Sequence, residues 1–166
     1  MPAVEERAAR VQLAVFDVDG VFTDGRLYYG ARGEQLKAFH VRDGHGIKLL
    51  LRHGLRVAVI SGRRSPAVAL RMRELGIRHL FQGRDDKLAV LQKLLQQFKL
   101  AWNQVACVGD DLVDLPLFES AGLAVAVADA QPEVRARAHH VTRTRGGEGA
   151  VREVCDLLLT ARNRKA

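Results

Sequence analysis

Residues 13 to 20 begin as an apolar run and end in two carboxylates and a glycine. The run Leu13–Phe16 predicts a buried strand, and Asp17, Asp19 and Gly20 follow it directly. Side chains two residues apart in a strand point the same way, so both acids are expected on one face. The glycine lets the chain turn sharply. Two neighbouring acids repel each other unless a cation binds them or one takes a proton, so the pattern suggests a functional site if partner residues follow.

Three further polar elements follow in order along the chain. The buried strand 57–60 ends at Ser61, whose hydroxyl can donate to a phosphate oxygen. Lys87 lies at the start of a helical stretch and would supply a fixed positive charge. The buried strand 105–109 is followed by a group of acids, Asp110, Asp111 and Asp114. Each pattern alone is usually a turn or a solvated surface, but four in this order, three of them at strand ends, favour one common site.

Strand-like and helix-like stretches alternate along the whole chain. The strands expected after the first are 57–61, 79–82, 105–109, 123–127 and 140–142. The first helix expected is capped by Asp43 and ends near Gly54, and the others expected are 66–76, 86–98, 113–120, 132–138 and 150–161. Such alternation implies a parallel sheet covered by helices on both faces, with ligands at the carboxyl ends of the strands. We therefore expect one α/β domain over residues 1–166, a three-layer αβα Rossmann-like fold.

Residues 21–41 are expected to form a β-hairpin inserted after the first strand. Its β-rich stretches are 26–29 and 35–41, on either side of a glycine-containing turn. The apolar residues Leu27, Tyr28 and Tyr29 stand among polar neighbours. An apolar ribbon with nothing in its own chain to pack on suggests assembly between copies of the chain, while folding back on its own core is the alternative.

The ordered motifs resemble those of the haloacid dehalogenase (HAD) superfamily of phosphotransferases, whose motifs are Asp-x-Asp, Ser or Thr, Lys and an acidic pair. The resemblance implies a HAD-like fold and four catalytic residues. Asp17 would be the nucleophile that forms an aspartyl-phosphate, and Asp19 the acid that protonates the leaving oxygen and then the base that activates water. Ser61 and Lys87 would hold the phosphoryl oxygens.

The same resemblance implies a Mg²⁺ cofactor. Its ligands would be Asp17, the backbone carbonyl of Asp19, and Asp110, with Asp111 or Asp114 helping directly or through water. Oxygen ligands with retained waters suit Mg²⁺ better than zinc. A carboxylate that attacks a phosphate meets like charge, and two unit charges about 4 Å apart repel by roughly 4 kcal/mol at an effective dielectric near 20. A metal ion and a lysine reverse that repulsion.

Many members of this superfamily carry a separate cap domain that excludes water from the site. The intervals 20–60 and 62–86, where a cap would be inserted, hold only the hairpin, helices and one strand. This chain therefore resembles the capless subgroup. Such an enzyme accepts macromolecular substrates through an open site or takes a cover from a neighbouring subunit.

Three stretches, 17–25, 39–47 and 146–153, resemble signatures of the 3-deoxy-D-manno-octulosonate 8-phosphate phosphatases. That family is a capless tetramer that releases phosphate from an eight-carbon sugar acid in lipopolysaccharide synthesis. The resemblance implies substrate contacts from Asp19, His40, Val41, Arg42, Asp43, Gly44, Lys48, Gly62, Arg63, Arg71 and Lys87. The glycine-rich loop 146–149 precedes a helix, which allows anion contact or insertion into a neighbour's site.

Three other interpretations remain open. Within the class, an acylneuraminate 9-phosphate phosphatase or another sugar-phosphate phosphatase would carry the same motifs. A phosphoreceiver signalling domain also combines clustered Asp, a Ser or Thr and a Lys, but it places its phosphate-accepting Asp on a later strand. A catalytically inactive scaffold is disfavoured because every catalytic position is filled.

Composition indicates which molecules the protein binds and in which cellular compartment it is expected. The formal charge is +7, yet aromatic residues make up only 5% and no nucleic-acid motif occurs, so a positive field for anionic substrates is the better explanation. No apolar stretch is long enough to span a membrane and the start lacks a signal-peptide pattern, so we expect a cytoplasmic protein. Cys107 and Cys155 are expected to be buried thiols, and the basic tail 162–166 is expected to be frayed.

Overall fold

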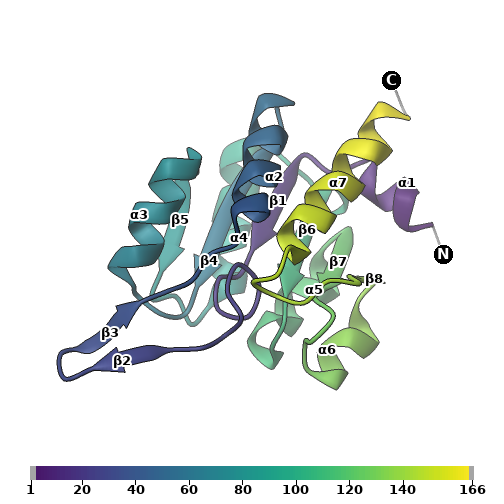
Figure 1. The fold of residues 1–166 in the computed structure, drawn as a ribbon. Helices are drawn as coiled ribbons and strands as arrows, with labels where there is room; N and C mark the ends of the chain where they lie inside the picture. The colour runs from purple at the N-terminus through teal and green to yellow at the C-terminus, as the bar shows by residue number, and fades with distance from the viewer. Residues whose placement is uncertain (1–2, 165–166) are drawn as a thin grey trace.

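A computed structural model, which describes residues 3–164, contains a six-stranded sheet with helices on both faces (Figure 1). In spatial order its strands are β5 (His79–Gln82), β4 (Arg56–Ser61), β1 (Leu13–Phe16), β6 (Val105–Gly109), β7 (Leu123–Ala126) and β8 (His140–Val141). All neighbouring strands are parallel. Every residue of β1, β6 and β7 is buried, as expected for a parallel sheet covered on both faces. The predicted fold class is confirmed.

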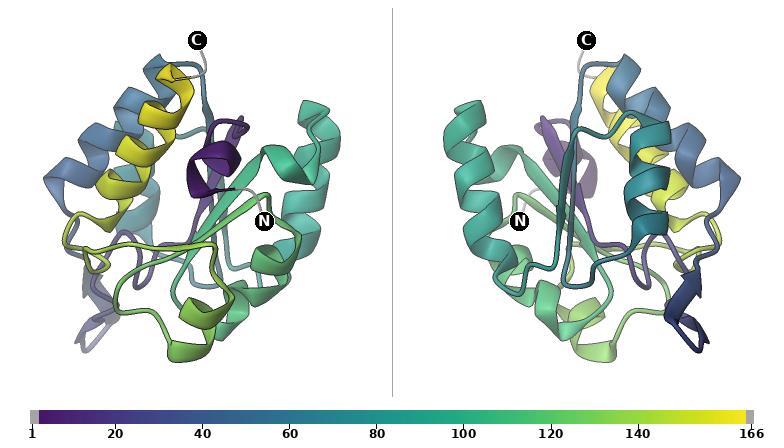
Figure 2. Two further views of the ribbon diagram at one scale, coloured as in Figure 1. Left: turned by 90° about the vertical axis from the view of Figure 1, so that its right-hand side faces the viewer. Right: turned by 90° about the vertical axis from the view of Figure 1, so that its left-hand side faces the viewer.

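The helices form the two outer layers (Figure 2). One layer contains α2 (Val41–Arg52), α3 (Pro66–Leu75) and α7 (Ala150–Asn163). The opposite layer contains α4 (Lys87–Phe98) and α5 (Leu115–Ser120), and α5 packs beside α6 (Pro132–Arg137). A short amino-terminal helix that the sequence did not predict, α1 (Val4–Ala8), packs against α7. No separate cap domain occurs within residues 3–164.

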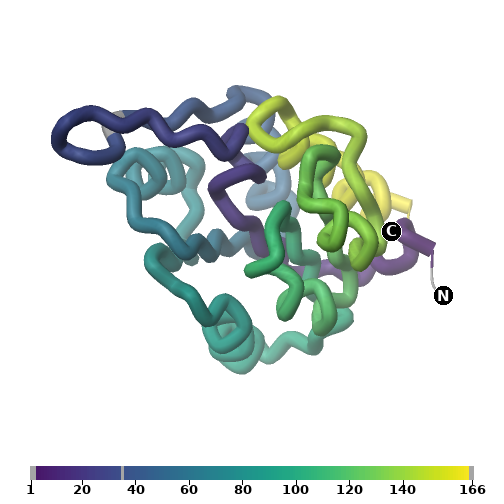
Figure 3. The backbone as a smooth tube through the Cα atoms, turned by 90° about the horizontal axis from the view of Figure 1, so that it is seen from below, coloured from purple at the N-terminus to yellow at the C-terminus, as the bar shows by residue number. Residues whose placement is uncertain are grey.

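The hairpin has different bounds from those predicted. Its strands are β2 (Tyr28–Gly30) and β3 (Gly33–Leu36), so the bounds of the predicted stretches, 26–29 and 35–41, were wrong. Gly33 adopts a left-handed conformation with φ of +98°, which lets β3 begin immediately after a two-residue turn. The hairpin projects from the body of the molecule (Figure 3).

Helix α2 starts earlier than predicted. His40 is the residue that caps it, since its ring Nδ1 accepts from the backbone N of Arg42 at 3.2 Å. Asp43, the predicted cap, is instead the third residue of the helix and is buried, and its Oδ1 accepts from the backbone N of Arg152 at 2.8 Å. Asp43 therefore connects the starts of α2 and α7. Because its carboxylate is used in this contact, Asp43 lies inside α2 and does not cap it.

Three smaller differences concern helix ends. Helix α5 begins at Leu115, because Asp111 Oδ1 accepts from the backbone N of Leu112 at 2.8 Å and starts a separate 3-10 turn, η2 (Leu112–Asp114). A second unpredicted 3-10 turn is η1 (Trp102–Gln104). The tail was predicted to fray from residue 162, but α7 continues to Asn163. Residues 165 and 166 of that tail lie outside the described residues.

Both cysteines are buried free thiols, as predicted. None of the helices between residues 3 and 164 is long and apolar enough to cross a membrane. The parallel arrangement brings the ends of β1, β4 and β6 to one edge of the sheet. The loops that follow these strands lie on the side of the molecule that faces the viewer in Figure 3. The expected site therefore lies on this side of the sheet.

The contact between α2 and α7 generates a stability prediction. A Cβ added at Gly46 would lie 3.0 Å from the Cβ of Cys155 and 3.0 Å from Cδ of Arg152. We expect Gly46→Val to force these helices apart and to lower the free energy of unfolding by about 1–3 kcal/mol, the usual effect of overpacking. Chemical denaturation measures this. The control is His45→Val at the neighbouring exposed position, where the change should be within about 0.5 kcal/mol. Equal stability of the two variants would contradict the tight packing.

Candidate active site

A cavity of about 290 Å³ opens at the carboxyl ends of β1, β4 and β6. The side chains that line it are Asp17, Asp19, Ser61, Gly62, Arg63, Arg84, Asp85, Lys87, Asp110, Asp111 and Val113. All four predicted catalytic residues belong to this lining. They come from the ends of two strands, β1 and β4, and from the start of α4, which the parallel sheet brings together.

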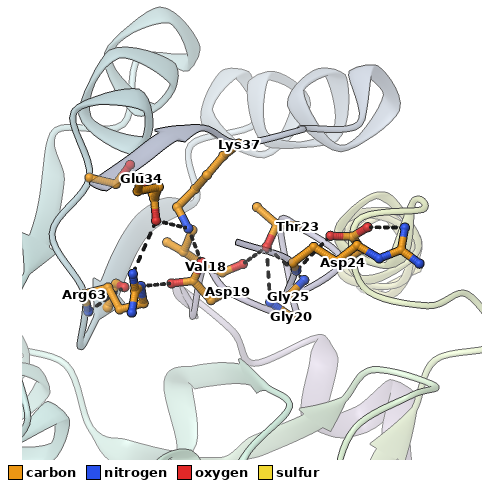
Figure 4. A network of polar contacts seen from close by, with 12 residues as sticks. Val18, Asp19, Gly20, Thr23, Asp24, Gly25, Glu34, Lys37 and Arg63 are labelled. Atoms are coloured by element: carbon orange, nitrogen blue, oxygen red, sulfur yellow. Dashed lines mark hydrogen bonds and ion pairs between the residues drawn. The ribbon is translucent and has the colours of Figure 1, made fainter. Parts of the chain in front are cut away.

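The loop after β1 has a fixed shape. The Oγ1 of Thr23 accepts from the backbone N of Gly20 at 3.3 Å and from that of Gly25 at 3.2 Å (Figure 4). Gly20 has a φ of +89°, and an added Cβ would lie 2.0 Å from Oδ2 of Asp110. Any other residue at position 20 would therefore be strained and would displace Asp110. The glycine predicted to permit a sharp turn also permits the close approach of the third acid.

The glycine-rich loop packs on this β1 loop of its own chain. A Cβ added at Gly146 would lie 1.7 Å from the carbonyl oxygen of Gly20, and the backbone N of Gly147 donates to the carbonyl of Val21 at 3.0 Å. The backbone N of Gly146 also donates to Oδ1 of Asp129 at 2.9 Å. Gly146 and Gly147 therefore support the β1 loop of their own chain, and contact of the glycine-rich loop with a neighbour's site stays a prediction.

Lys87 is the charged centre of the site. Its Nζ lies 2.9 Å from Oδ1 of Asp17 and 2.7 Å from Oδ1 of Asp114, and the side chain is only 4% exposed. Burial alone would lower the pKa of Lys87, but the charges of Asp17 and Asp114 outweigh burial and raise it above its ordinary value. Lys87 therefore carries a permanent positive charge beside the predicted nucleophile.

The acids around Lys87 have the chemistry of a cation site. One oxygen from each of Asp17, Asp110 and Asp114 lies within 4.8 Å of the others. Burial raises the pKa of Asp17 to about 6, although Lys87 opposes the rise. Burial, together with the charges of Asp17 and Asp114, raises the pKa of Asp110 to about 8. Oδ1 of Asp110 is buried without a hydrogen-bond partner among residues 3–164. A bound cation would satisfy that oxygen and stabilise the ionised acids.

Asp111 and Asp114 have different surroundings. Asp114 is 2% exposed, and its Oδ2 accepts from the backbone N of Asp110 at 3.1 Å while Oδ1 accepts from Lys87. It therefore holds Lys87 and the loop in place. Asp111 is exposed and caps the 3-10 turn that follows it. Of these two acids, only Asp114 contributes an oxygen to the three-acid cluster.

Ser61 and Arg63 form the β4 side of the site. Ser61 is 2% exposed, and its Oγ accepts from the backbone N of Arg63 at 3.3 Å. The hydroxyl hydrogen of Ser61 is thus available to a bound oxygen. Gly62 and Arg63 are exposed and line the cavity, so this loop presents a hydroxyl and a guanidinium to a ligand.

Asp19 is held by Arg63 and by a lysine, Lys37, that the sequence interpretation missed. The Nζ of Lys37 contacts Oδ1 of Asp19, and Nε of Arg63 lies 4.0 Å from Oδ2 (Figure 4). Glu34 accepts from Arg63 at 3.4 Å and lies 3.2 Å from the Nζ of Lys37. A lysine or glutamate in a polar hairpin looks like an ordinary solvated residue, so the sequence pattern contained no signal for either one. Three other cavity residues were also missed, Arg84, Asp85 and Val113.

The structure divides the predicted substrate contacts into two groups. Asp19, Gly62, Arg63 and Lys87 line the cavity, whereas seven do not: His40, Val41, Arg42, Asp43, Gly44, Lys48 and Arg71. In this second group the guanidinium of Arg71 lies against Gly44, where an added Cβ would be 2.4 Å from Nη2. Arg71 also pairs with Glu74 at 3.4 Å. Within one chain, therefore, these seven residues gather around the start of α2 and do not complete the cavity.

Comparison with known proteins agrees with this site. A family model described as haloacid dehalogenase-like hydrolase matches residues 76–154. A 3-deoxy-D-manno-octulosonate 8-phosphate phosphatase from Yersinia pestis is 51% identical over 161 residues, which cover 97% of this chain and 86% of the relative. The crystal structure of the phosphatase from that organism superposes with a TM-score of 0.95, over 97% of this chain and 87% of that chain.

Two further solved structures were determined with ligands. The phosphatase from Moraxella catarrhalis, crystallised with a magnesium ion, a phosphate ion and a KDO molecule, is 40% identical with a TM-score of 0.94, over 97% of this chain and 92% of that chain. A cobalt-bound phosphatase from Haemophilus influenzae is 44% identical with a TM-score of 0.92, over 95% of this chain and 92% of that chain. The chain therefore belongs to the 3-deoxy-D-manno-octulosonate 8-phosphate phosphatases, within the haloacid dehalogenase-like hydrolases.

Proposed function

We propose that this protein is a Mg²⁺-dependent phosphomonoesterase that converts 3-deoxy-D-manno-octulosonate 8-phosphate into the free sugar acid and phosphate for lipopolysaccharide synthesis. The observation that carries the proposal is the buried Lys87 between Asp17 and Asp114, at the bottom of a cavity that Asp19 also lines. This arrangement places a nucleophile, a positive charge and a proton donor around a volume that accepts a phosphoryl group.

The residues divide the reaction into two steps. An oxygen of Asp17 attacks phosphorus, the bond from phosphorus to the sugar oxygen breaks, and the leaving oxygen takes a proton from Asp19. Water then attacks phosphorus of the aspartyl-phosphate and gives a proton to Asp19. The bond between Asp17 and phosphorus breaks, so that phosphate is released and Asp17 is regenerated. Ser61 and Lys87 hold the phosphoryl oxygens throughout. Phosphoryl transfer depends mainly on such alignment and charge neutralisation.

Asp17 and Asp110 would hold the Mg²⁺, with Asp114 close behind them and the backbone carbonyl of Asp19 as a further predicted ligand. The unpartnered oxygen of Asp110 and the three converging carboxylates fit a hard cation with oxygen ligands. When bound, the ion neutralises charge on the acids and on the phosphoryl group. The chain itself supplies Lys87 for the same purpose, so the anionic nucleophile is never left uncompensated.

Arg63 is the residue best placed to select the substrate within this chain. Its guanidinium is exposed at the cavity edge and lies close to Asp19. Guanidinium groups bind carboxylates through two parallel hydrogen bonds, and the proposed substrate is a sugar acid. An acylneuraminate 9-phosphate also carries a carboxylate, so Arg63 could bind it as well, and it is the competing substrate of this class.

The second part of this proposal is assembly: we infer a homo-oligomer, a tetramer, in which a neighbouring chain completes the site. Four apolar side chains of the hairpin are exposed, Leu27, Tyr28, Tyr29 and Leu36. The cavity of about 290 Å³ lies at the lower end of ordinary small-molecule sites, which are roughly 300–1,000 Å³. A phosphorylated eight-carbon acid needs more contact than this cavity offers, and the group around the start of α2 can supply it from another chain.

The proposed compartment is the cytoplasm, and the proposed partners are the sugar-acid phosphate and copies of the same chain. Nucleic acid and membrane insertion are not part of this function. The formal charge of +7 favours encounter with an anionic substrate.

The first functional prediction concerns activity. Phosphate release is measured with the octulosonate 8-phosphate, an acylneuraminate 9-phosphate and neutral sugar phosphates, each with Mg²⁺ and with a chelator. We expect the octulosonate ester to give the highest kcat/KM and the chelator to abolish turnover.

Asp17→Asn should release no phosphate above background, and Asp19→Asn should lose roughly 10² to 10⁴ in kcat. Full activity of Asp17→Asn would contradict the aspartyl-phosphate mechanism, and preference for a neutral sugar would contradict the substrate.

A second prediction concerns pH and the metal. Because the pKa of Asp110 is raised from 3.8 to about 8, the folded protein without metal holds a proton that the unfolded chain releases. Its stability should therefore fall as pH rises between these values. Mg²⁺ must displace the same proton, so its affinity should increase from pH 6 to pH 8. Calorimetric titration with Mg²⁺ measures this, and Asp110→Asn is the control that should bind weakly with little pH dependence. Affinity that is equal at both pH values would contradict the raised pKa.

A third prediction concerns assembly. Light scattering at micromolar concentration should give a mass about four times the 18.3 kDa of one chain. Replacing Tyr29 by Glu places a charge on the most exposed hairpin aromatic, 63% exposed, and should shift the mass toward one chain and raise KM. The matched change Leu70→Glu, on the exposed side of α3, should leave both unchanged. A fully active protein of one-chain mass would refute completion of the site by a neighbour.

A further inference from the structure

Lys37 is a buried lysine that no step of the proposed reaction uses. It follows β3 directly, and its side chain is only 1% exposed although the hairpin around it is largely solvent-accessible. Its Nζ contacts Oδ1 of Asp19 and lies 3.2 Å from Oε2 of Glu34. An ammonium group removed from water is unfavourable unless it is paired, and both of its partners here are carboxylates.

These residues belong to a closed ring of charges with Arg63 (Figure 4). Arg63 lies 4.0 Å from Oδ2 of Asp19 and 3.4 Å from Oε2 of Glu34, and its Nη2 donates to the hydroxyl of Tyr29 at 3.0 Å. Burial opposes ionisation of Glu34, but its contacts with the positively charged Lys37 and Arg63 keep the pKa of Glu34 below its usual value. Two cations therefore balance two anions, and the hairpin provides one of each.

The ring restricts the orientation of Asp19. A carboxylate at the end of a short side chain can rotate about two bonds, yet this one must present an oxygen first to the leaving group and then to water. Contact of Lys37 with Oδ1 fixes that rotation and leaves Oδ2 on the side of Arg63, which lines the cavity. Lys37 itself is not part of the cavity lining, so it acts on the reaction through the residues it contacts, and of its two partners only Asp19 lines the cavity.

We propose that Lys37 is a positioning residue for Asp19, so that the hairpin sets the geometry of proton transfer at the active site of its own chain. This proposal rests on the proposed function, in which Asp19 is the acid and base. Removing the Lys37 charge would free the Asp19 carboxylate to rotate and would leave an unbalanced negative charge near the incoming phosphate. Proton transfer, and hence kcat, should then suffer more than substrate binding.

The test compares Lys37→Met and Lys37→Arg in the complete protein with Mg²⁺ and the octulosonate 8-phosphate. We expect Lys37→Met to lower kcat by roughly 10- to 100-fold, part of the effect typical of proton transfer, with KM within about threefold of wild type. Lys37→Arg, which keeps the charge, should recover most of the lost kcat. The matched control is Lys93→Met on the exposed side of α4, which should leave both constants unchanged.

A double-mutant cycle separates positioning from general structural support. If Lys37 acts through Asp19, then adding Lys37→Met to Asp19→Asn should lower kcat by less than about twofold further. Wild-type kcat in Lys37→Met, an effect on KM alone, or an equal additional loss in the double variant would each overturn the proposal. If Lys37→Met lowers the melting temperature of the protein, the cycle is repeated with Lys37→Gln in place of Lys37→Met. Failure of the proposed function is distinguishable, because the wild-type protein itself would then release no phosphate from the octulosonate 8-phosphate.

Discussion

The contact on which the rest of the site depends is the buried ammonium of Lys87 between Asp17 and Asp114. Moving one ion out of water costs several kcal/mol, so neither the lysine nor the two acids would remain charged there alone. Together they occupy the end of the central strand and hold a nucleophile beside a fixed positive charge. The same contact connects α4 to the loop after β6, so the active site and the packing of the sheet stabilise each other.

Most of the site could be predicted from sequence because it lies at strand ends. Asp17, Ser61 and Asp110 each follow an apolar run, and parallel strands in a covered sheet must finish at the same edge. The position of Lys87 at a helix start followed from the same alternation. Where a residue's role is determined by the topology of the sheet, the pattern of apolar and polar residues is enough to place it.

Residues whose surroundings depend on side-chain packing could not be placed in this way. Lys37 lies in a polar hairpin, and nothing in the pattern distinguishes it from a solvated lysine, yet it is buried against Asp19. Asp43 was interpreted as a helix cap because of its residue type, whereas its carboxylate contacts α7, more than 100 positions away in the chain. The hairpin bounds were wrong for a related reason, since β2 is exposed along its whole length and has no buried face to fix its position in the sequence.

The contact of Gly146 with Gly20 has a consequence for the order in which the enzyme becomes active. The loop that carries the nucleophile is made well before its support, which lies more than 100 positions later in the chain. A nascent chain without that support has its reactive acids and no fixed geometry for them. Because contacts between distant residues form late, catalytic competence should arise only after Gly146 and Gly147 have been made. Unfinished chains would then be unable to hydrolyse the phosphate esters around them.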